Sequence, residues 1–176
     1  VYLCLDFEMK QIMRVRRLEG LRSVYRNAGY DAEKCVAVCT PQTVLPKHHG
    51  EVDGYELGYL LTKHLLERGD DFTAAVGLND MIAIGAMDAI LDAGKRIPED
   101  YSVCGFDNIF TSSIITPPLT SIDHRLWARC RSAVDQIVKQ NDQGHGADKS
   151  AVMADKIEYA PQLMVRKSTG PARTSD

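Results

Sequence analysis

The chain has 176 residues, of which 44% are hydrophobic and 26% are charged, and its formal net charge is −3. These values are typical of a globular protein and exclude a strongly basic surface for nucleic acid. The sequence contains neither an apolar stretch long enough to span a membrane nor a secretory signal pattern. We therefore expect a cytoplasmic protein, unless a leader has been lost. Because the chain begins at Val1 and not at a methionine, we also expect it to be part of a longer protein whose missing part lies upstream.

The first part of the chain alternates between apolar runs and an amphipathic pattern. Residues 1–5 predict a buried strand, and the helix that follows ends at Gly29. Residues 35–39 predict a second strand, followed by a polar loop over 41–52 that is longer than usual for an α/β connection. The residues expected on the apolar face of the first helix are Leu18, Leu21, Val24, Tyr25 and Ala28.

The middle of the chain predicts two further strand and helix pairs. A helix capped by Asp53 runs to Gly69, and residues 72–78 form a third strand. A helix from Met81 ends near Gly94, and residues 102–106 form a fourth strand. The apolar stripe expected on the first of these helices comprises Tyr55, Tyr59, Leu60, Leu65 and Leu66.

The last part of the chain predicts a short extended run over 119–122, a helix over 126–138 with an apolar face toward a core, and a final strand over 157–165. Four strand and helix repeats with short connections predict an α/β fold, in which a parallel sheet is covered by helices on both faces.

The five cysteines form an odd set, and most of them lie in apolar runs. This pattern favours buried, reduced thiols. The pair Cys35 and Cys39 has no second pair and no histidine cluster beside it, so the sequence predicts no metal site and no cofactor.

Polar side chains follow the third and fourth predicted strands at the point where each strand ends. Asn79 and Asp80 follow the third strand, and Asp107 follows the fourth. Ligands of open α/β sheets bind beyond the carboxyl ends of the strands, so we expect these side chains to line one cleft. Ionised carboxylates accept strong hydrogen bonds, which suits a ligand rich in hydroxyl or amine groups. Alternatively, Asp80 serves only as the N-cap of the helix that follows it.

These segments resemble the effector-binding domain of the lac-repressor and gal-repressor family of bacterial transcription regulators. The resemblance rests on residues 74–87, 97–108 and 116–122, and it extends back to residues 16–21. It implies a periplasmic-binding-protein-like (type I) fold with two lobes, of which this chain is the C-terminal one. Ligand binding between the lobes would shift an upstream helix-turn-helix DNA reader between two conformations. We therefore expect the ligand-sensing domain of a repressor that binds a sugar or sugar derivative, with a purine as the alternative if His49 or an aromatic ring stacks on the effector. It would bind operator DNA through a domain outside this chain.

The resemblance also implies a division of the chain. Residues 1–122 would form the C-terminal lobe, and residues 123–155 would cross toward the missing N-terminal lobe. Residues 156–170 would return to the lobe as its final strand, and residues 171–176 would be a tail.

Four further residues acquire roles from the resemblance. Arg17 corresponds to an arginine that reaches the effector, although by its position alone it is an ordinary surface charge. His49 falls where relatives place an aromatic ring that stacks on the effector, unless the loop contains an insertion. Asp6 and Phe7 stand where relatives have a glycine pair, so this rim of the cleft is bulkier than the family's pattern.

A repressor of this type is expected to be a homodimer, because two-fold related DNA readers match palindromic operators. By resemblance, the helix after Asp80 and the segment before Pro117 meet their two-fold mates. The helix is apolar around most of its circumference, which equally fits burial of both its faces within one chain. The residues expected in the dimer interface are Met81, Ile84, Met87, Asp88, Ile114 and Ile115.

Two other functions stay open at this point. A periplasmic sugar-binding protein of a transporter has the same two-lobed fold, but free cysteines disfavour an oxidising compartment. An enzyme of doubly wound fold also carries carboxylates at strand tips. However, the sequence contains no nucleophile elbow, no glycine-rich phosphate loop and no pair of metal-binding histidines on one helix, so no catalytic residues are expected.

Overall fold

The structure is a computed structural model that describes residues 1–4, 12–44, 54–142 and 158–172. Its centre is a six-stranded sheet in the order β2-β1-β3-β4-β5-β6. The first five strands in this order pair in parallel, and only β6 runs antiparallel, beside β5. The strands are β1 (Tyr2–Leu3), β2 (Val38–Cys39), β3 (Ala74–Gly77), β4 (Ser102–Phe106), β5 (Thr120–Asp123) and β6 (Gln162–Met164).

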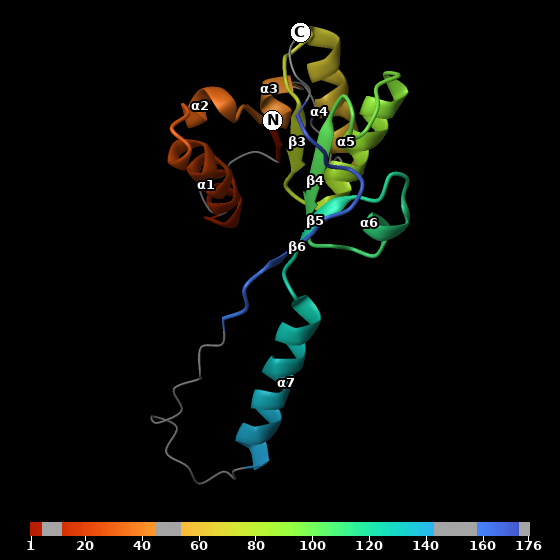
Figure 1. Cartoon of the computed structure of the whole chain (residues 1–176). Helices are drawn as coiled ribbons and strands as arrows, with labels where there is room; N and C mark the ends of the chain where they lie inside the picture. Colours follow the sequence, from red (N-terminus) through yellow and green to blue (C-terminus); the bar gives the residue numbers. More distant parts are fainter. Residues whose placement is uncertain (5–11, 45–53, 143–157, 173–176) are drawn as a thin grey trace.

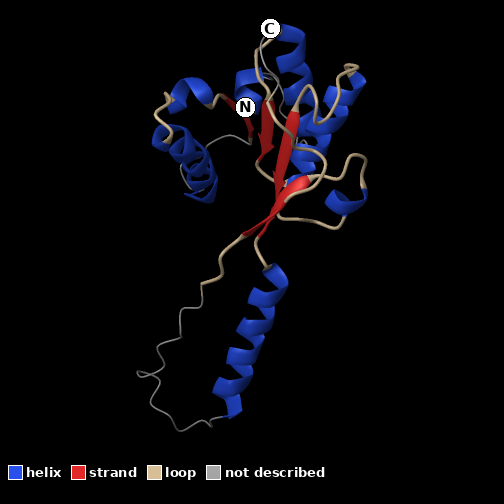
Figure 2. Ribbon diagram, viewed as in Figure 1, coloured by secondary structure: helices blue, strands red, loops and turns tan. Residues whose placement is uncertain are grey.

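Helices lie on both sides of this sheet, with α1 and α2 on one side and α4 and α5 on the other (Figures 1 and 2). The predicted α/β class is thus confirmed. The helices are α1 (Ile12–Asn27), α2 (Ala32–Cys35), α3 (Pro41–Val44), α4 (Gly54–Arg68), α5 (Asp80–Asp92), α6 (Thr111–Ile114) and α7 (Leu126–Asp142).

The two faces of the sheet are covered unequally. Ala75 and Val103 point toward α4 and α5 and are only 1% and 0% exposed. Their neighbours Val76 and Cys104, on the opposite face, are half-buried. Because successive strand residues alternate between faces, this pattern means that α1 covers its side of the sheet less completely than α4 and α5 cover theirs.

Two glycines bring α4 and α5 unusually close together. A Cβ atom at Gly58 would lie 2.0 Å from the Ile82 carbonyl oxygen, and one at Gly85 would lie 2.0 Å from the Tyr55 carbonyl oxygen. Only a residue without a side chain permits this approach. On α4 the contact buries Leu57, Leu61 and Leu65.

The observed α4 face differs from the predicted stripe. Leu65 is buried as expected, but Tyr55, Tyr59 and Leu60 are half-buried. The tyrosine hydroxyls lie at the margin of the helix pair, where Tyr55 donates a hydrogen bond of 2.6 Å to Asp88. The difference arises because the position of Gly58 against α5 determines which side of α4 faces inward.

The first helix also differs from the prediction. Leu18 is 8% exposed, but Val24 and Tyr25, which were expected to face the core, are 65% and 40% exposed. The predicted second strand begins later than expected, because Cys35 ends the short helix α2. The cap of α2 is Asp31, whose carboxylate accepts a hydrogen bond of 3.1 Å from the backbone N–H of Glu33.

None of the five cysteines, all of which are described, forms a disulfide, but the prediction that they are buried is only partly correct. Cys4 and Cys39 are buried and Cys104 is half-buried, whereas Cys35 and Cys130 are exposed. The two exposed thiols lie on α2 and α7, which contribute little to the core.

Helix α7 projects away from the sheet and from the other helices (Figure 1). The predicted helix is present, but its apolar face meets no core among the described residues: Trp127 is 91% exposed and Ile137 is 66% exposed. Within the described ranges, none of the helices combines the length and the hydropathy that crossing a bilayer requires.

Candidate functional site

The tip of β3 passes directly into α5 at Asn79. The Asn79 backbone is extended, and its side-chain oxygen accepts a hydrogen bond of 2.9 Å from the backbone N–H of Ile82. Asn79 is therefore the N-cap of α5. The alternative in which Asp80 serves as this cap is wrong, because Asp80 is already the first helical residue.

Asp80 is a fully buried carboxylate with 0% exposure. One of its oxygens accepts hydrogen bonds from the backbone N–H of Ile109 at 2.8 Å and from the Ser112 hydroxyl at 2.6 Å. The other oxygen accepts a hydrogen bond of 2.5 Å from the Ser121 hydroxyl. Gly105 makes room for the group, since a Cβ there would lie 2.2 Å from the carboxylate. Asp80 thus connects the start of α5 to the segments that follow β4 and begin β5.

The turn after β4 has an unusual backbone. Asp107 and Asn108 have φ values of 106° and 51°, in a region that L-residues rarely adopt and that Asp and Asn tolerate better than most. The backbone N–H of Asp107 donates to the Ile122 carbonyl at 2.9 Å, and that of Asn108 donates to the Ser121 hydroxyl at 3.0 Å. Strained backbone of this kind persists where the surroundings hold it, and it is concentrated at ligand sites.

Four side chains meet above this turn, and we call them the strand-tip cluster: Arg17, Phe106, Asp107 and His124. The Arg17 guanidinium lies 3.8 Å from the centre of the Phe106 ring, and its Nη2 is 3.9 Å from Asp107 Oδ1. His124 Nε2 is 3.3 Å from the same carboxylate oxygen. The rings of Phe106 and His124 are 4.5 Å apart.

The Arg17 side chain is held in place by the backbone that directly follows β3. One of its Nη atoms donates a hydrogen bond to the Leu78 carbonyl, and its other Nη is 3.5 Å from His124 Nε2. The Arg17 side chain is 20% exposed and that of Asp107 is 42% exposed, so both have surface left for a ligand. The cluster therefore offers a cation, an anion, an imidazole and a ring face at one place.

The charge balance at Asp107 reflects two opposing effects. Burial raises the pKa of the Asp107 carboxyl, while the neighbouring Arg17 and His124 lower it. Burial is the larger effect, so the pKa lies above its usual value. A ligand that donates hydrogen bonds to the Asp107 carboxylate would therefore stabilise its ionised form.

The structure brings some of the predicted ligand-binding residues together and leaves others elsewhere. Arg17 and Asp107 lie side by side in the strand-tip cluster. The Asn79 side chain is engaged as a helix cap, and Asp80 lies beneath the cluster with no exposed surface. The remaining predicted positions, which lie outside the described residues, are Asp6, Phe7 and His49.

Phe106 and His124 were not among the predicted ligand-binding residues. The rule that selected Asp107, a polar residue just beyond a predicted strand, applies equally to His124, which follows the extended run over 119–122. Phe106 lacked such an indication, because only the placement of α1 puts a guanidinium over its ring.

The residues predicted for the dimer interface have very different exposures. Met81 and Ile114 are 41% and 62% exposed, whereas Ile84 and Met87 are 7% and 1% exposed. Asp88 and Ile115 are half-buried. The apolar circumference of α5 is thus explained by burial within the chain. The homodimer itself stays a prediction.

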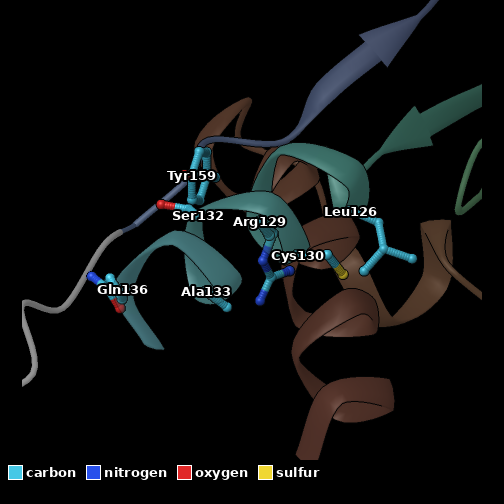
Figure 3. A pocket seen from close by; sticks show the side chains of 7 residues that line it. All are labelled: Leu126, Arg129, Cys130, Ser132, Ala133, Gln136 and Tyr159. Atoms are coloured by element: carbon cyan, nitrogen blue, oxygen red, sulfur yellow. The ribbon is translucent and has the colours of Figure 1, made fainter. Parts of the chain in front are cut away.

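A hollow lies along α7 (Figure 3). It has a volume of about 380 Å³ and is lined by one side of α7 and by Tyr159, whose hydroxyl is 3.5 Å from the Ala128 carbonyl oxygen. Its walls are part of the exposed helix described above. In the part of the chain that the structure describes, no group of three or more histidine, cysteine, aspartate or glutamate side chains is arranged to hold a metal ion.

Comparisons with known proteins agree with this architecture. Residues 3–169 match a family described as periplasmic binding protein-like domain. The chain is 32% identical over 148 residues to the HTH-type transcriptional repressor PurR of Haemophilus influenzae (strain PittEE). This match covers 84% of this chain and 42% of that protein. It is also 32% identical over 165 residues to PurR of Pasteurella multocida, and this second match covers 92% of this chain and 43% of that protein. The chain thus spans less than half the length of these relatives.

Solved structures share the fold. The transcription regulator CcpA of Lactococcus lactis superposes with a TM-score of 0.70 at 22% identity, over 97% of this chain and 55% of that one. A sugar-binding transcriptional regulator of the LacI family from Escherichia coli, complexed with phosphate, gives a TM-score of 0.71 at 24% identity over the same shares of the two chains.

Proposed function

Because the chain belongs to the family of periplasmic binding protein-like domains, we propose that it is the ligand-binding part of a helix-turn-helix transcriptional repressor. The similarity to PurR repressors supports this proposal. Since the chain spans 42% of such a repressor, operator DNA would be bound by a segment outside it. A protein with this role works where the operator is, in the cytoplasm.

The observation that carries the proposal is the strand-tip cluster. It lies at the carboxyl ends of β3, β4 and β5, which is where open parallel sheets bind ligands. A guanidinium next to a carboxylate suits a small molecule that carries several hydroxyl groups, and a ring face suits the apolar side of a sugar ring. The proposed effector is therefore a sugar or sugar derivative. The E. coli regulator with the same fold is itself described as sugar-binding.

Within this site we assign Arg17 and Asp107 to direct contact with the effector, and we add His124 to them. Asp80 has a positioning role, because its three hydrogen bonds hold the turn that presents Asp107. Asp6, Phe7 and His49 stay proposals that rest on the resemblance alone.

The exposed helix α7 supports the proposed division of the chain. Its apolar residues Trp127, Val134 and Ile137 are 91%, 57% and 66% exposed. A helix with such a face normally packs on another element. We assign residues 123–155 to a crossing toward a second lobe formed by an upstream segment, with β6 returning to the sheet within residues 156–170 and residues 171–176 as a tail.

We propose that the chain binds its ligand without catalysing a reaction, because the relatives are repressors and the strand-tip cluster contains no serine, threonine or cysteine nucleophile. Effector binding would favour one of two arrangements of the lobes, and the repressor would couple this difference to the operator.

The proposal is tested by titration calorimetry of the full-length protein with a panel of sugars and sugar phosphates. Asp107→Asn keeps the shape of the side chain and tolerates the left-handed backbone, so it isolates the charge. We expect it to weaken binding of the effector about tenfold, the loss typical of a hydrogen bond to a charged group. Arg17→Lys should weaken it comparably, because lysine keeps the charge but loses the planar fork.

Glu99→Ala is the matched control, since it removes an exposed carboxylate that precedes β4, at the opposite end of this strand from Asp107. If no compound on the panel binds, the sugar assignment is wrong. If a compound binds equally well to the protein and to both cluster variants, the site lies elsewhere.

A further inference from the structure

Arg166 lies two residues beyond the end of β6 and bonds two segments that are distant from it in the sequence. Its Nη1 donates a hydrogen bond of 2.6 Å to the Leu119 carbonyl, just before β5. Its Nη2 donates one of 2.6 Å to the side-chain oxygen of Asn108, in the turn after β4. Hydrogen bonds from a charged donor are stronger than those between neutral groups. The guanidinium therefore joins the start of β5 to the turn that presents Asp107.

The backbone around Arg166 is itself fixed. The Arg166 N–H donates a hydrogen bond of 2.9 Å to the Thr120 hydroxyl. Two residues later, the buried Ser168 hydroxyl donates to the Val103 carbonyl at 2.6 Å and accepts from the backbone N–H of Thr120 at 2.8 Å. This segment is thus anchored to β4 and β5, so the Arg166 side chain extends from a rigid support.

The guanidinium determines how the Asn108 amide is oriented, because arginine can only donate hydrogen bonds. The Asn108 oxygen faces Arg166, which leaves the Nδ2 group to donate to Asp123 Oδ2 at 3.4 Å. The other oxygen of Asp123 accepts a hydrogen bond of 2.6 Å from the backbone N–H of Arg125, directly before α7. One chain of hydrogen bonds thus runs from the segment after β6, through the turn after β4, to the connection between β5 and α7.

The turn after β4 needs this support because its backbone is strained. Both Asp107 and Asn108 have positive φ values, and residues keep such a conformation only where their surroundings hold them. The Ser121 hydroxyl, 3.0 Å from the Asn108 nitrogen, holds the backbone of the turn. Arg166 holds its side chain.

We propose that Arg166 is a positioning residue for the strand-tip cluster. Through the Asn108 side chain it holds the turn in the conformation that presents Asp107, and it ties this turn to the start of α7. The consequence for effector binding rests on the proposed function, in which Asp107 contacts the effector. In that case the same hydrogen bonds join the effector contact to the segment assigned to the second lobe.

Hydrogen exchange of the full-length protein, measured by mass spectrometry without effector or DNA, tests the support of the turn. Arg166→Met removes both side-chain donors and keeps most of the aliphatic stem. We expect exchange to become about tenfold faster in the peptides over 104–110 and 121–128, the change expected for one lost hydrogen bond to a charged group. The peptide over 57–65, in α4, should exchange at an unchanged rate.

Two further variants accompany this measurement. Arg96→Met is the matched control, because it removes an exposed guanidinium that bonds Asp100 before the start of β4, and it should leave both peptides unchanged. Asn108→Gly removes the acceptor of Arg166, while glycine adopts a positive φ without strain. It should accelerate exchange in both peptides although Arg166 is present. If circular dichroism shows that Arg166→Met does not fold, Asn108→Gly decides the question.

Calorimetry with the panel sugar that binds the unaltered protein most tightly tests the consequence for the effector. Arg166→Met should weaken binding about three- to tenfold. Combined with Asp107→Asn, it should give a loss smaller than the product of the two single losses, because residues that act through one another are not additive. Losses that multiply would show that Arg166 does not act through Asp107, and they would overturn the positioning role.

Unchanged exchange over 104–110 in both Arg166→Met and Asn108→Gly would also overturn the inference. So would faster exchange in Arg166→Met without any loss of sugar affinity. If no sugar on the panel binds, the proposed effector class is wrong, and hydrogen exchange still decides whether Arg166 holds the turn. The two proposals therefore fail separately.

Discussion

Asp80 is a single buried carboxylate that holds three segments at once. Its partners come from the turn after β4, from α6 and from β5, and each bond is 2.8 Å or shorter. Removing the group leaves their hydrogen-bonding atoms buried without an acceptor.

We therefore expect Asp80→Ala to lower the free energy of unfolding by about 3 kcal/mol or more, the cost of losing several bonds to a buried charge. Urea unfolding followed by circular dichroism measures this change. Glu99→Ala, which removes an exposed carboxylate, should change it by less than about 0.5 kcal/mol. A cost for Asp80→Ala no larger than that of the control would contradict the positioning role.

Asp107 illustrates the opposite relation between a charge and stability. Its pKa is raised by burial, so folding favours the protonated form. The resulting stabilisation is fully present below the unfolded pKa of about 3.9, and it is lost as the pH rises through the higher folded value. At neutral pH the ionised carboxylate therefore opposes folding.

Asp107→Asn should accordingly raise the melting temperature at pH 7, and the difference from the unaltered protein should disappear below about pH 3, where the aspartate is protonated in both states. Thermal unfolding measured across this pH range tests the expectation. A variant that is less stable at pH 7 would mean that the attraction of Arg17 and His124 outweighs burial.

At the scale of elements, the helix pair α4 and α5 depends on two glycines. Gly85 faces the Tyr55 carbonyl so closely that even one methyl group requires the helices to separate. A Cβ at Gly58, on α4, would likewise clash with the backbone of Ile82 on α5.

Gly85→Ala should therefore destabilise the protein by about 1–3 kcal/mol, the usual cost of overpacking, although alanine is the better helix former. Gly20→Ala is the matched control, because a Cβ there meets open space and should leave stability equal or higher. Chemical unfolding of the two variants compares them directly. A Gly85→Ala protein as stable as the Gly20→Ala protein would show that the helices can separate without cost.

At the scale of the whole molecule, two of the places where apolar side chains are exposed concern assembly. One is the face of α7, which we assign to the second lobe. The other is around Met81, Phe110 and Ile114, which are 41%, 79% and 62% exposed. The second place contains the solvent-accessible part of the interface predicted by resemblance.

If the protein is a homodimer through this surface, Ile114→Asp puts a charge into a self-complementary contact and should yield monomers in analytical ultracentrifugation. Ile84 is unsuited to this test, because it is buried within the chain and its substitution would unfold the lobe. Leu91→Asp, at an exposed position near the end of α5, should leave the assembly unchanged. A dimer of full strength with Ile114→Asp would place the interface elsewhere.

The sequence by itself determined the class of the fold and the positions of the strand tips. β4 was predicted with its observed bounds, and α5 was predicted to within one residue at its start. Both are specified locally, by an apolar run or a helical periodicity that ends at turn-forming residues. The placement of Asp107 beyond a strand follows from the same local pattern.

Only the tertiary structure decided what these residues do. Asp80 and Asp107 look alike in the sequence, yet one is buried under three donors and the other is partly exposed beside Arg17. Their difference depends on segments far along the chain, such as Ser121 and His124, which meet them only when β4 and β5 pair. The incomplete covering of one face of the sheet likewise depends on the distance between α1 and the sheet. Such distances are set by the packing of the whole lobe, and no local periodicity encodes them.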